Sequence, residues 1–149
     1  MINIFLSEQS DKHQDLTFHI GGMIEPAVVD TYYFYLSLND GDKPFFLEKF
    51  KFWLIKIVDL VKQINTNQEL NIPICLYDEY SEFISIKKFN NKGMCNLYLK
   101  SVSIEGYTFN PWTDTNMSIQ KDLIHAYKGG VICHIDEIIE GLEDSIRNI

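Results

Sequence analysis

We predict that the chain folds as one α+β domain, in which an antiparallel β-meander packs against one long helix and a C-terminal helix. Three observations predict this class. Apolar residues recur at the spacing of one helix face over residues 44–64, three strand-like runs follow one another over 71–104, and a second helical stripe covers 136–149. No Pro-, Gly- or Ser-rich linker divides the 149 residues, so a single domain spanning 1–149 is expected.

Two short strands are predicted before the long helix. Apolar and polar residues alternate over 16–20, and a glycine pair ends that run. Alternation returns over 31–38, where the aromatic content favours a strand. Residues 23–29 lie between these runs and contain Pro26, so we predict a connection there.

The long helix is predicted to begin just after a turn at 39–42. Asp42 is placed to cap it, and Pro44 suits its first turn. So much of its circumference is apolar that the helix must be largely covered. A membrane span is excluded because charged side chains recur along the helix, at Glu48, Lys49, Lys51, Lys56, Asp59 and Lys62.

The β-meander is predicted from three runs, 71–77, 82–89 and 94–104, which two polar turns separate. Pro73 cannot donate to a strand ladder, so the first run is expected to start there or to lie at a sheet edge. The third run changes the parity of its apolar residues, which predicts a bulge or bend near residues 100–101.

The last third of the chain contains one ambiguous segment and one clear helix. Residues 118–128 fit either a short helix that ends at Gly129 or a strand that turns through Gly129–Gly130 into 131–135, and we favour the helix. Residues 136–149 carry an apolar stripe, with acidic residues in the first turn where the helix dipole favours negative charge.

The charge of the chain excludes some classes of partner. Acidic residues number 21 and basic residues 13, which gives a net charge of −8, and Arg147 is the only arginine. Nucleic-acid binding needs a basic face, and an anionic membrane repels an acidic protein. The acid excess lies in residues 1–42 and 102–149, whereas 43–101 carries more bases than acids. Acidic flanks of this kind either aid solubility or meet a basic protein partner.

Cysteine usage indicates a reducing compartment. The three cysteines, Cys75, Cys95 and Cys133, include no CxxC pair, so we predict free thiols buried as small hydrophobes. Residues 1–8 lack the basic region and the long apolar stretch of a secretory signal. Together these features predict a cytoplasmic protein.

We find no motif for catalysis, a metal ion or a cofactor, so we expect none of the three. Cys133 and His134 are adjacent, and neighbouring residues of a strand point to opposite faces. A pocket between helices and sheet could instead bring His19 or His125 to Cys133. A small enzyme or ligand-binding domain with such a pocket is our alternative hypothesis.

The aromatic-rich segment 43–50 precedes a β-meander, and the chain approaches its end through the acidic segment 135–144. In this overall character the sequence resembles small acidic immunity proteins of bacterial toxin–immunity systems, which include polymorphic-toxin and contact-dependent inhibition systems. The likeness covers the whole chain and contains no specific motif. The resemblance implies a cytosolic protein that neutralises a toxin, often a cationic nuclease, by stoichiometric binding.

We therefore predict a non-catalytic binding protein whose partner is a basic protein, most concretely a toxin domain. The first candidate partner-binding residues surround a tyrosine in a turn of the meander, because aromatic anchors beside charged groups carry much interface energy; they are Asp78, Glu79, Tyr80 and Glu82. The second group is acidic and lies on the last helix, at Asp136, Glu137, Glu140, Glu143 and Asp144. A third hypothesis is a subunit of a larger assembly, with Trp53 or Trp112 in an interface.

Overall fold

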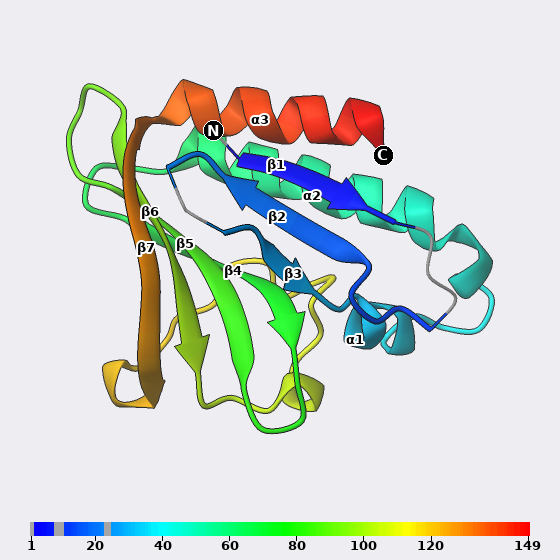
Figure 1. Ribbon diagram of the computed structural model, residues 1–149. Helices are drawn as coiled ribbons and strands as arrows, with labels where there is room; N and C mark the ends of the chain where they lie inside the picture. Colours follow the sequence, from blue (N-terminus) through cyan, green and yellow to red (C-terminus); the bar gives the residue numbers. More distant parts are fainter. Residues whose placement is uncertain (1, 8–10, 23–24) are drawn as a thin grey trace.

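The computed structural model describes residues 2–7, 11–22 and 25–149, which form two antiparallel sheets and three α-helices (Figure 1). The N-terminal sheet has the strand order β1-β2-β3, and the large sheet has the order β4-β5-β6-β7. In chain order the elements are β1 (Ile2–Leu6), β2 (Leu16–Ile20), β3 (Ala27–Val29), α1 (Tyr32–Leu36), α2 (Phe46–Gln63), β4 (Glu69–Leu76), β5 (Ser81–Lys88), β6 (Met94–Val102), β7 (Ile124–His134) and α3 (Ile135–Asn148). The predicted α+β class is confirmed.

One hydrophobic core lies between the two sheets and the helices. The N-terminal sheet contributes Ile4 and Phe18, the large sheet contributes Ile72 and Ile84, and α2 contributes Trp53, all of them buried. Burying each such side chain is worth about 1.5–3 kcal/mol. Figure 1 shows the N-terminal sheet in front of α2, and it shows α3 along the top of the molecule. The core is therefore closed on three sides by different elements.

The helix α3 lies directly against the edge strand β1, and a glycine makes this close approach possible. A Cβ atom at Gly141 would lie 1.9 Å from the carbonyl oxygen of Ile2. One turn later, the Ser145 hydroxyl accepts a hydrogen bond from the Ile4 N–H (2.8 Å) and donates one to the Gly141 carbonyl (2.7 Å). The helix thus covers the outer edge of β1 and satisfies a backbone N–H that the sheet leaves without a partner.

The predicted long helix is confirmed as α2, which follows a 3₁₀ turn at Lys43–Phe45 with Pro44 in an early position. The expected cap at Asp42 is wrong, because its side chain makes no capping hydrogen bond and its carboxylate pairs with Lys49 at 3.4 Å. The 3₁₀ turn separates Asp42 from α2, whose N-cap residue is Phe45. Within the described parts of the chain, no helix combines the length and apolar content that a bilayer crossing needs.

The predicted strand over 31–38 is wrong, because this segment forms the short helix α1. Its central ring, Phe34, is fully buried and packs on Phe50, Trp53 and Trp112 with centroid distances of 5.1 to 6.1 Å. The Trp112 indole N–H also donates to the Phe34 carbonyl (2.7 Å). Tertiary packing of one ring therefore overrides the strand propensity of four consecutive aromatic residues.

Two further segments are strands, contrary to prediction. Residues 23–29 were expected to form a connection, but β3 pairs with β2 there; residues 23–24 of this segment lie outside the described residues. The favoured helix over 118–128 is also wrong, because only a 3₁₀ turn at Lys121–Leu123 precedes β7. The alternative was right that this segment contains a strand, but the hairpin turn that it placed at Gly129–Gly130 is not formed.

The strand β7 continues through the glycine pair that could have formed a hairpin turn. Gly129 and Gly130 have φ angles of +75° and +151°, and the register between β6 and β7 shifts close by, between Leu97 and Leu99. Glycine tolerates such backbone angles, so the pair bends the strand at an irregularity in the ladder. Pairing with β6 keeps both sides of the bend in one strand.

The predicted meander and C-terminal helix are confirmed as β4–β6 and α3. Pro73 lies in β4, which is an edge strand as predicted, and the ladder to β5 is irregular directly after it. The register shift between Ser101 and Val102 confirms the bulge expected near residues 100–101. At the start of α3, His134 Nδ1 accepts the Asp136 N–H (3.2 Å), and Glu137 accepts the His134 N–H (3.1 Å), which caps the helix.

A polar network lies on the side of the large sheet that faces away from the core. Lys100 is only 4% exposed, and its ammonium donates to the Glu69 carboxylate (3.0 Å) and to the Asn71 side-chain oxygen (2.9 Å). The Tyr98 hydroxyl also donates to Glu69. Burial alone would raise the pKa of Glu69, but these two hydrogen bonds hold it below its usual value. The buried charge is therefore paired, which is what its burial requires.

The contact between α3 and β1 predicts that Gly141→Ala destabilises the protein although alanine is the better helix former. The new methyl group would meet the backbone of Ile2, which cannot rotate away, so we expect a loss of at least about 2 kcal/mol in the free energy of unfolding. Urea denaturation followed by circular dichroism measures this loss. Gly41→Ala is the matched control, because a Cβ there meets nothing within 4 Å. Equal stability of the two variants would contradict the packing described here.

Candidate functional site

The turn between β4 and β5 carries the first group of predicted binding residues and is built around two tyrosines. Tyr77 and Tyr80 stack with centroids 4.5 Å apart, and the Tyr77 N–H donates to the Tyr80 carbonyl (2.9 Å). Asp78 and Glu79, at the tip between them, are exposed. The stacked rings hold the turn in one shape, so its carboxylates extend from a rigid base.

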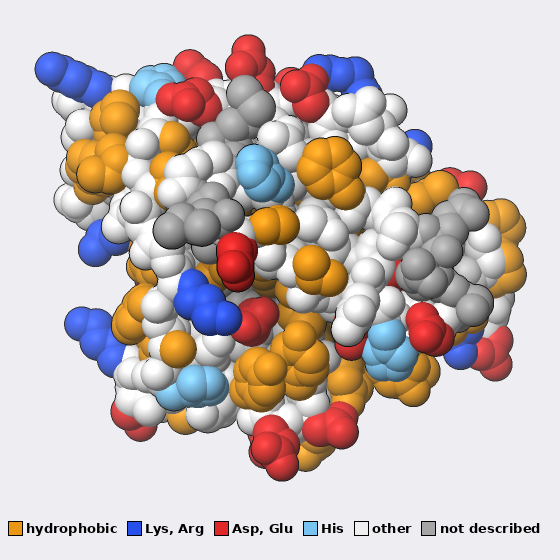
Figure 2. Space-filling view, viewed as in Figure 1, with side chains coloured by type: hydrophobic (Ala, Val, Ile, Leu, Met, Phe, Trp, Pro, Cys, Tyr) orange, Lys and Arg blue, Asp and Glu red, His pale blue; other side chains and the backbone are white. Residues whose placement is uncertain are grey.

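A groove of about 630 Å³ lies beside this turn, between the start of β3 and the inner face of the large sheet. Figure 2 shows apolar side chains gathered low on this face of the molecule, with acidic side chains below and beside them. The groove is lined by Glu25, Pro26, Ala27, Val28, Tyr77, Tyr80, Glu82, Leu99 and Lys128. Two predicted residues, Tyr80 and Glu82, therefore belong to a concave surface.

The charged groups of the groove lie around the tyrosine pair. Glu82 is half-buried, and its carboxylate accepts a hydrogen bond from the Ser101 hydroxyl (3.3 Å). Burial, and after it the negative charge of Glu82, raises the pKa of the Tyr80 phenol. Burial and a hydrogen bond with Cys75 raise the pKa of Tyr77. Both phenols therefore remain neutral at physiological pH and offer O–H donors beside a carboxylate.

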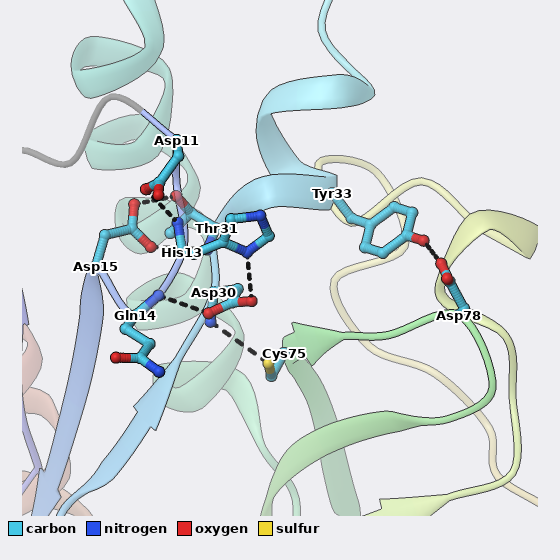
Figure 3. A network of polar contacts seen from close by, with 9 residues as sticks. All are labelled: Asp11, His13, Gln14, Asp15, Asp30, Thr31, Tyr33, Cys75 and Asp78. Carbon is cyan, nitrogen blue, oxygen red and sulfur yellow. Dashed lines mark hydrogen bonds and ion pairs between the residues drawn. The ribbon is translucent and has the colours of Figure 1, made fainter.

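A network of buried and half-buried polar groups fixes the loop before β2 and the helix α1 next to this turn (Figure 3). Asp15 is 1% exposed and accepts hydrogen bonds from the N–H and hydroxyl of Thr31 (2.9 and 2.5 Å). Asp30 binds His13 Nδ1 (2.8 Å) and accepts the Gln14 N–H (2.6 Å). These contacts join residues 13–15, before β2, to residues 30–31, which follow β3 and lead into α1.

The same network reaches the candidate turn at two points. The Asp30 N–H lies 3.5 Å from the Cys75 sulfur in β4, which connects the two sheets. The Tyr33 hydroxyl of α1 donates to the Asp78 carboxylate, as Figure 3 shows. Asp78 thus has an intramolecular partner, whereas Glu79 extends from the tip of the turn. Glu79 is exposed at the tip and Glu82 lines the groove, so these two acids are better placed than Asp78 to meet a partner.

The second group of predicted residues lies elsewhere. Figure 1 shows α3 at the top of the molecule and the β4–β5 turn at the bottom, so one compact partner surface does not include both. Four of the five acids of this group also have partners within the chain: Asp136 lies 3.2 Å from His134 Nδ1, Glu137 caps the helix, Glu143 pairs with Lys62 (2.9 Å), and Asp144 pairs with Arg147. Asp136 and Glu140 are both exposed, and Glu140 is the acid of this group that has no such contact among the described residues.

The pocket of the alternative hypothesis is not assembled. His125 and Cys133 lie eight residues apart on β7, which separates them by about 26 Å in an extended strand. Cys133 is buried beside its ladder partner Cys95, and His19 is exposed on β2. Burial raises the pKa of Cys133 and raises that of Cys95 to about 11. The prediction of three buried free thiols is confirmed.

No three acidic, histidine or cysteine side chains among residues 2–7, 11–22 and 25–149 gather in a way that could hold a metal ion.

Sequence reasoning missed part of the lining of the groove. Residues 25–28 belong to the segment predicted as a connection, and Lys128 to the segment predicted as a helix. A signal was present in the β-branched pair Val28–Val29, which favours a strand directly after Pro26.

No protein-family model and no curated protein sequence matches the chain. Among solved structures, the fold matches a chain of the "CdiA-CT/CdiI toxin and immunity complex from Enterobacter cloacae". The match covers 100% of both chains with a TM-score of 0.55 and 12% sequence identity. At 12% sequence identity the likeness concerns the fold alone. As a likeness of fold, it confirms the resemblance expected from the sequence.

The electrostatics of the groove predict that Glu82→Gln lowers the pKa of Tyr80 toward its ordinary value. The carboxylate disfavours the negative phenolate, so removing its charge makes the phenol a stronger acid. A pH titration of the tyrosine ring carbons by NMR measures this shift. Glu79→Gln, in the same turn, serves as the control and should leave the Tyr80 titration unchanged. An unchanged titration in Glu82→Gln would show that this carboxylate does not act on the groove.

Proposed function

We propose that this protein is an immunity protein that neutralises a basic toxin domain by stoichiometric binding, and that the groove beside the β4–β5 turn is part of its binding surface. The observation that carries the proposal is the match, over the full length of both chains, to a chain of a toxin and immunity complex. The net charge of −8 supports a basic partner, because opposite charge accelerates association.

The surface around the groove has the composition of a protein interface. A specific interface buries about 800 Å² on each partner, more than a groove alone supplies. The outward face of the N-terminal sheet extends it, with Phe5 58% and Val28 51% exposed. Val28 belongs to this face and also lines the groove. Apolar and aromatic residues with carboxylates around them are the arrangement in which anchors carry the binding energy.

The groove supports the proposal better than α3 does. Carboxylates that already pair within the chain gain less from a new cation, because the existing contact must be broken first. Glu143 and Asp144 are paired in this way, whereas Glu79 is not engaged with Lys or Arg in the described structure. The proposal places binding in the cytoplasm, where a toxin that enters a cell would act.

The test is a pull-down with the tagged protein from its own host, at low and then moderate salt, followed by binding kinetics with the captured partner. We expect a stoichiometric complex with a basic toxin domain. Reversing Glu79 and Glu82 to lysine should slow association by about tenfold or more and weaken its salt dependence. Reversing Asp136 and Glu140 on α3 is the matched control and should change association less than about threefold.

Two outcomes would contradict these assignments. A larger effect from the α3 reversals would move the binding surface to that helix. If no basic partner is captured at either salt concentration by a folded, monodisperse protein, the immunity assignment itself is wrong. Circular dichroism of each variant confirms that the reversals act on binding and leave the fold intact.

A second candidate function, a subunit of a larger assembly, is favoured by a different surface. Trp53 is buried and Trp112 is half-buried, so neither offers the interface that the sequence suggested. Apolar residues of α2 and of the 3₁₀ turn before it are exposed instead, with Phe45 at 56%, Phe52 at 66% and Ile55 at 42%. Apolar groups this exposed are typical of contacts with another chain. Light scattering with a mass above one 17.4 kDa chain would support this candidate, and a monomer would exclude self-assembly.

A further inference from the structure

The groove combines an aromatic wall with carboxylates on two sides. The stacked pair Tyr77–Tyr80 forms the wall next to the β4–β5 turn. Glu82 extends from β5 on the large sheet, and Glu25 extends from the segment before β3 on the opposite side. Leu99, at 5% exposure, forms part of an apolar floor. A ligand that enters between these walls meets negative charge at both sides and a ring beside it.

The charges of the lining favour a cation over an anion. Glu25 and Glu82 are opposed, among the described lining residues, by Lys128 alone. Lys128 lies on β7, two strands from Glu82 in the order β5-β6-β7, which is about 10 Å across the sheet. Its charge therefore weakens the negative field at the β7 side and leaves the tyrosine side acidic.

We propose that the tyrosine side of the groove receives an arginine side chain of the partner, an inference that rests on the proposed function. A guanidinium is flat, so it lies along an aromatic ring while its N–H groups donate to a carboxylate in pairs. A lysine ammonium lacks this planar geometry. A nucleobase would also stack on tyrosine, but its phosphate would be repelled by the carboxylates. The chemistry of the walls therefore selects arginine.

The test uses a small probe, so that it does not depend on the partner. N-acetyl-arginine amide is titrated into the ¹⁵N-labelled protein, and amide shifts are followed by NMR. We expect saturable shifts at Tyr80, Glu82 and Lys128, with binding about tenfold tighter than for N-acetyl-citrulline amide, which has nearly the same shape without the charge. N-acetyl-lysine amide should bind more weakly than the arginine probe.

Variants of the lining separate the proposed contacts. Glu82→Gln should weaken binding of the arginine probe about tenfold, and Tyr80→Leu should weaken it about threefold. Lys128→Met should strengthen binding, because it removes the opposing charge. Asp136→Asn on α3 is the matched control and should leave binding unchanged. Spectra that are unchanged away from the groove verify that each variant is folded.

Equal binding of the arginine and citrulline probes, or shifts spread over all acidic surfaces without saturation, would overturn the arginine assignment. If a toxin domain is captured but the probe does not bind the groove, the arginine assignment fails and the immunity function stands. If the probe binds as expected but no basic partner is captured, the chemistry of the groove stands and the proposed function fails.

Discussion

The close contact between α3 and β1 is the constraint on which the rest of the structure depends. A three-stranded sheet with one open edge and one open face is marginal by itself. Gly141 lets the backbone of α3 touch the backbone of β1, and Ser145 takes up the Ile4 N–H. Two segments from opposite ends of the sequence thereby close one side of the core. The edge left for other contacts is that of β3, and this is the edge that borders the groove.

The position of the groove follows from how the N-terminal sheet and the large sheet are joined to each other. They share the core but form separate hydrogen-bonded ladders, so their relative placement depends on side chains. Phe34 enters the aromatic cluster of α2, while Asp15 and Asp30 join the loop before β2 to the residues after β3. The carboxyl group of Asp15 is buried, which is tolerable because the N–H and the hydroxyl of Thr31 both donate to it. The acidic character of the first 42 residues is thus partly structural.

Acidic residues therefore play different parts in this protein, although they look alike in the sequence. Asp15 stabilises a loop, Glu137 caps a helix, and Glu69 holds the buried Lys100. Such groups have fixed partners and contribute little to the attraction of another molecule. Glu82 differs because it lines a groove with an aromatic wall, and Glu79 differs because it is exposed in the adjoining turn. A net charge describes the long-range field, whereas recognition depends on the few carboxylates that remain free to form new contacts.

The sequence alone determined the elements whose periodicity is long and consistent with their environment. The face of α2, the meander β4–β6 with Pro73 at an edge, and the stripe of α3 were all predicted, because local pattern and tertiary burial agree there. The turn that contains Tyr80 was predicted because turn composition is a local property. Tertiary structure decided the rest. It made a helix of residues 32–36, since burial of Phe34 outweighs strand propensity, and it made strands of β3 and β7, which depend on partners far away in the sequence. The second wall of the groove comes from those two strands, so it exists only once the sheets have come together.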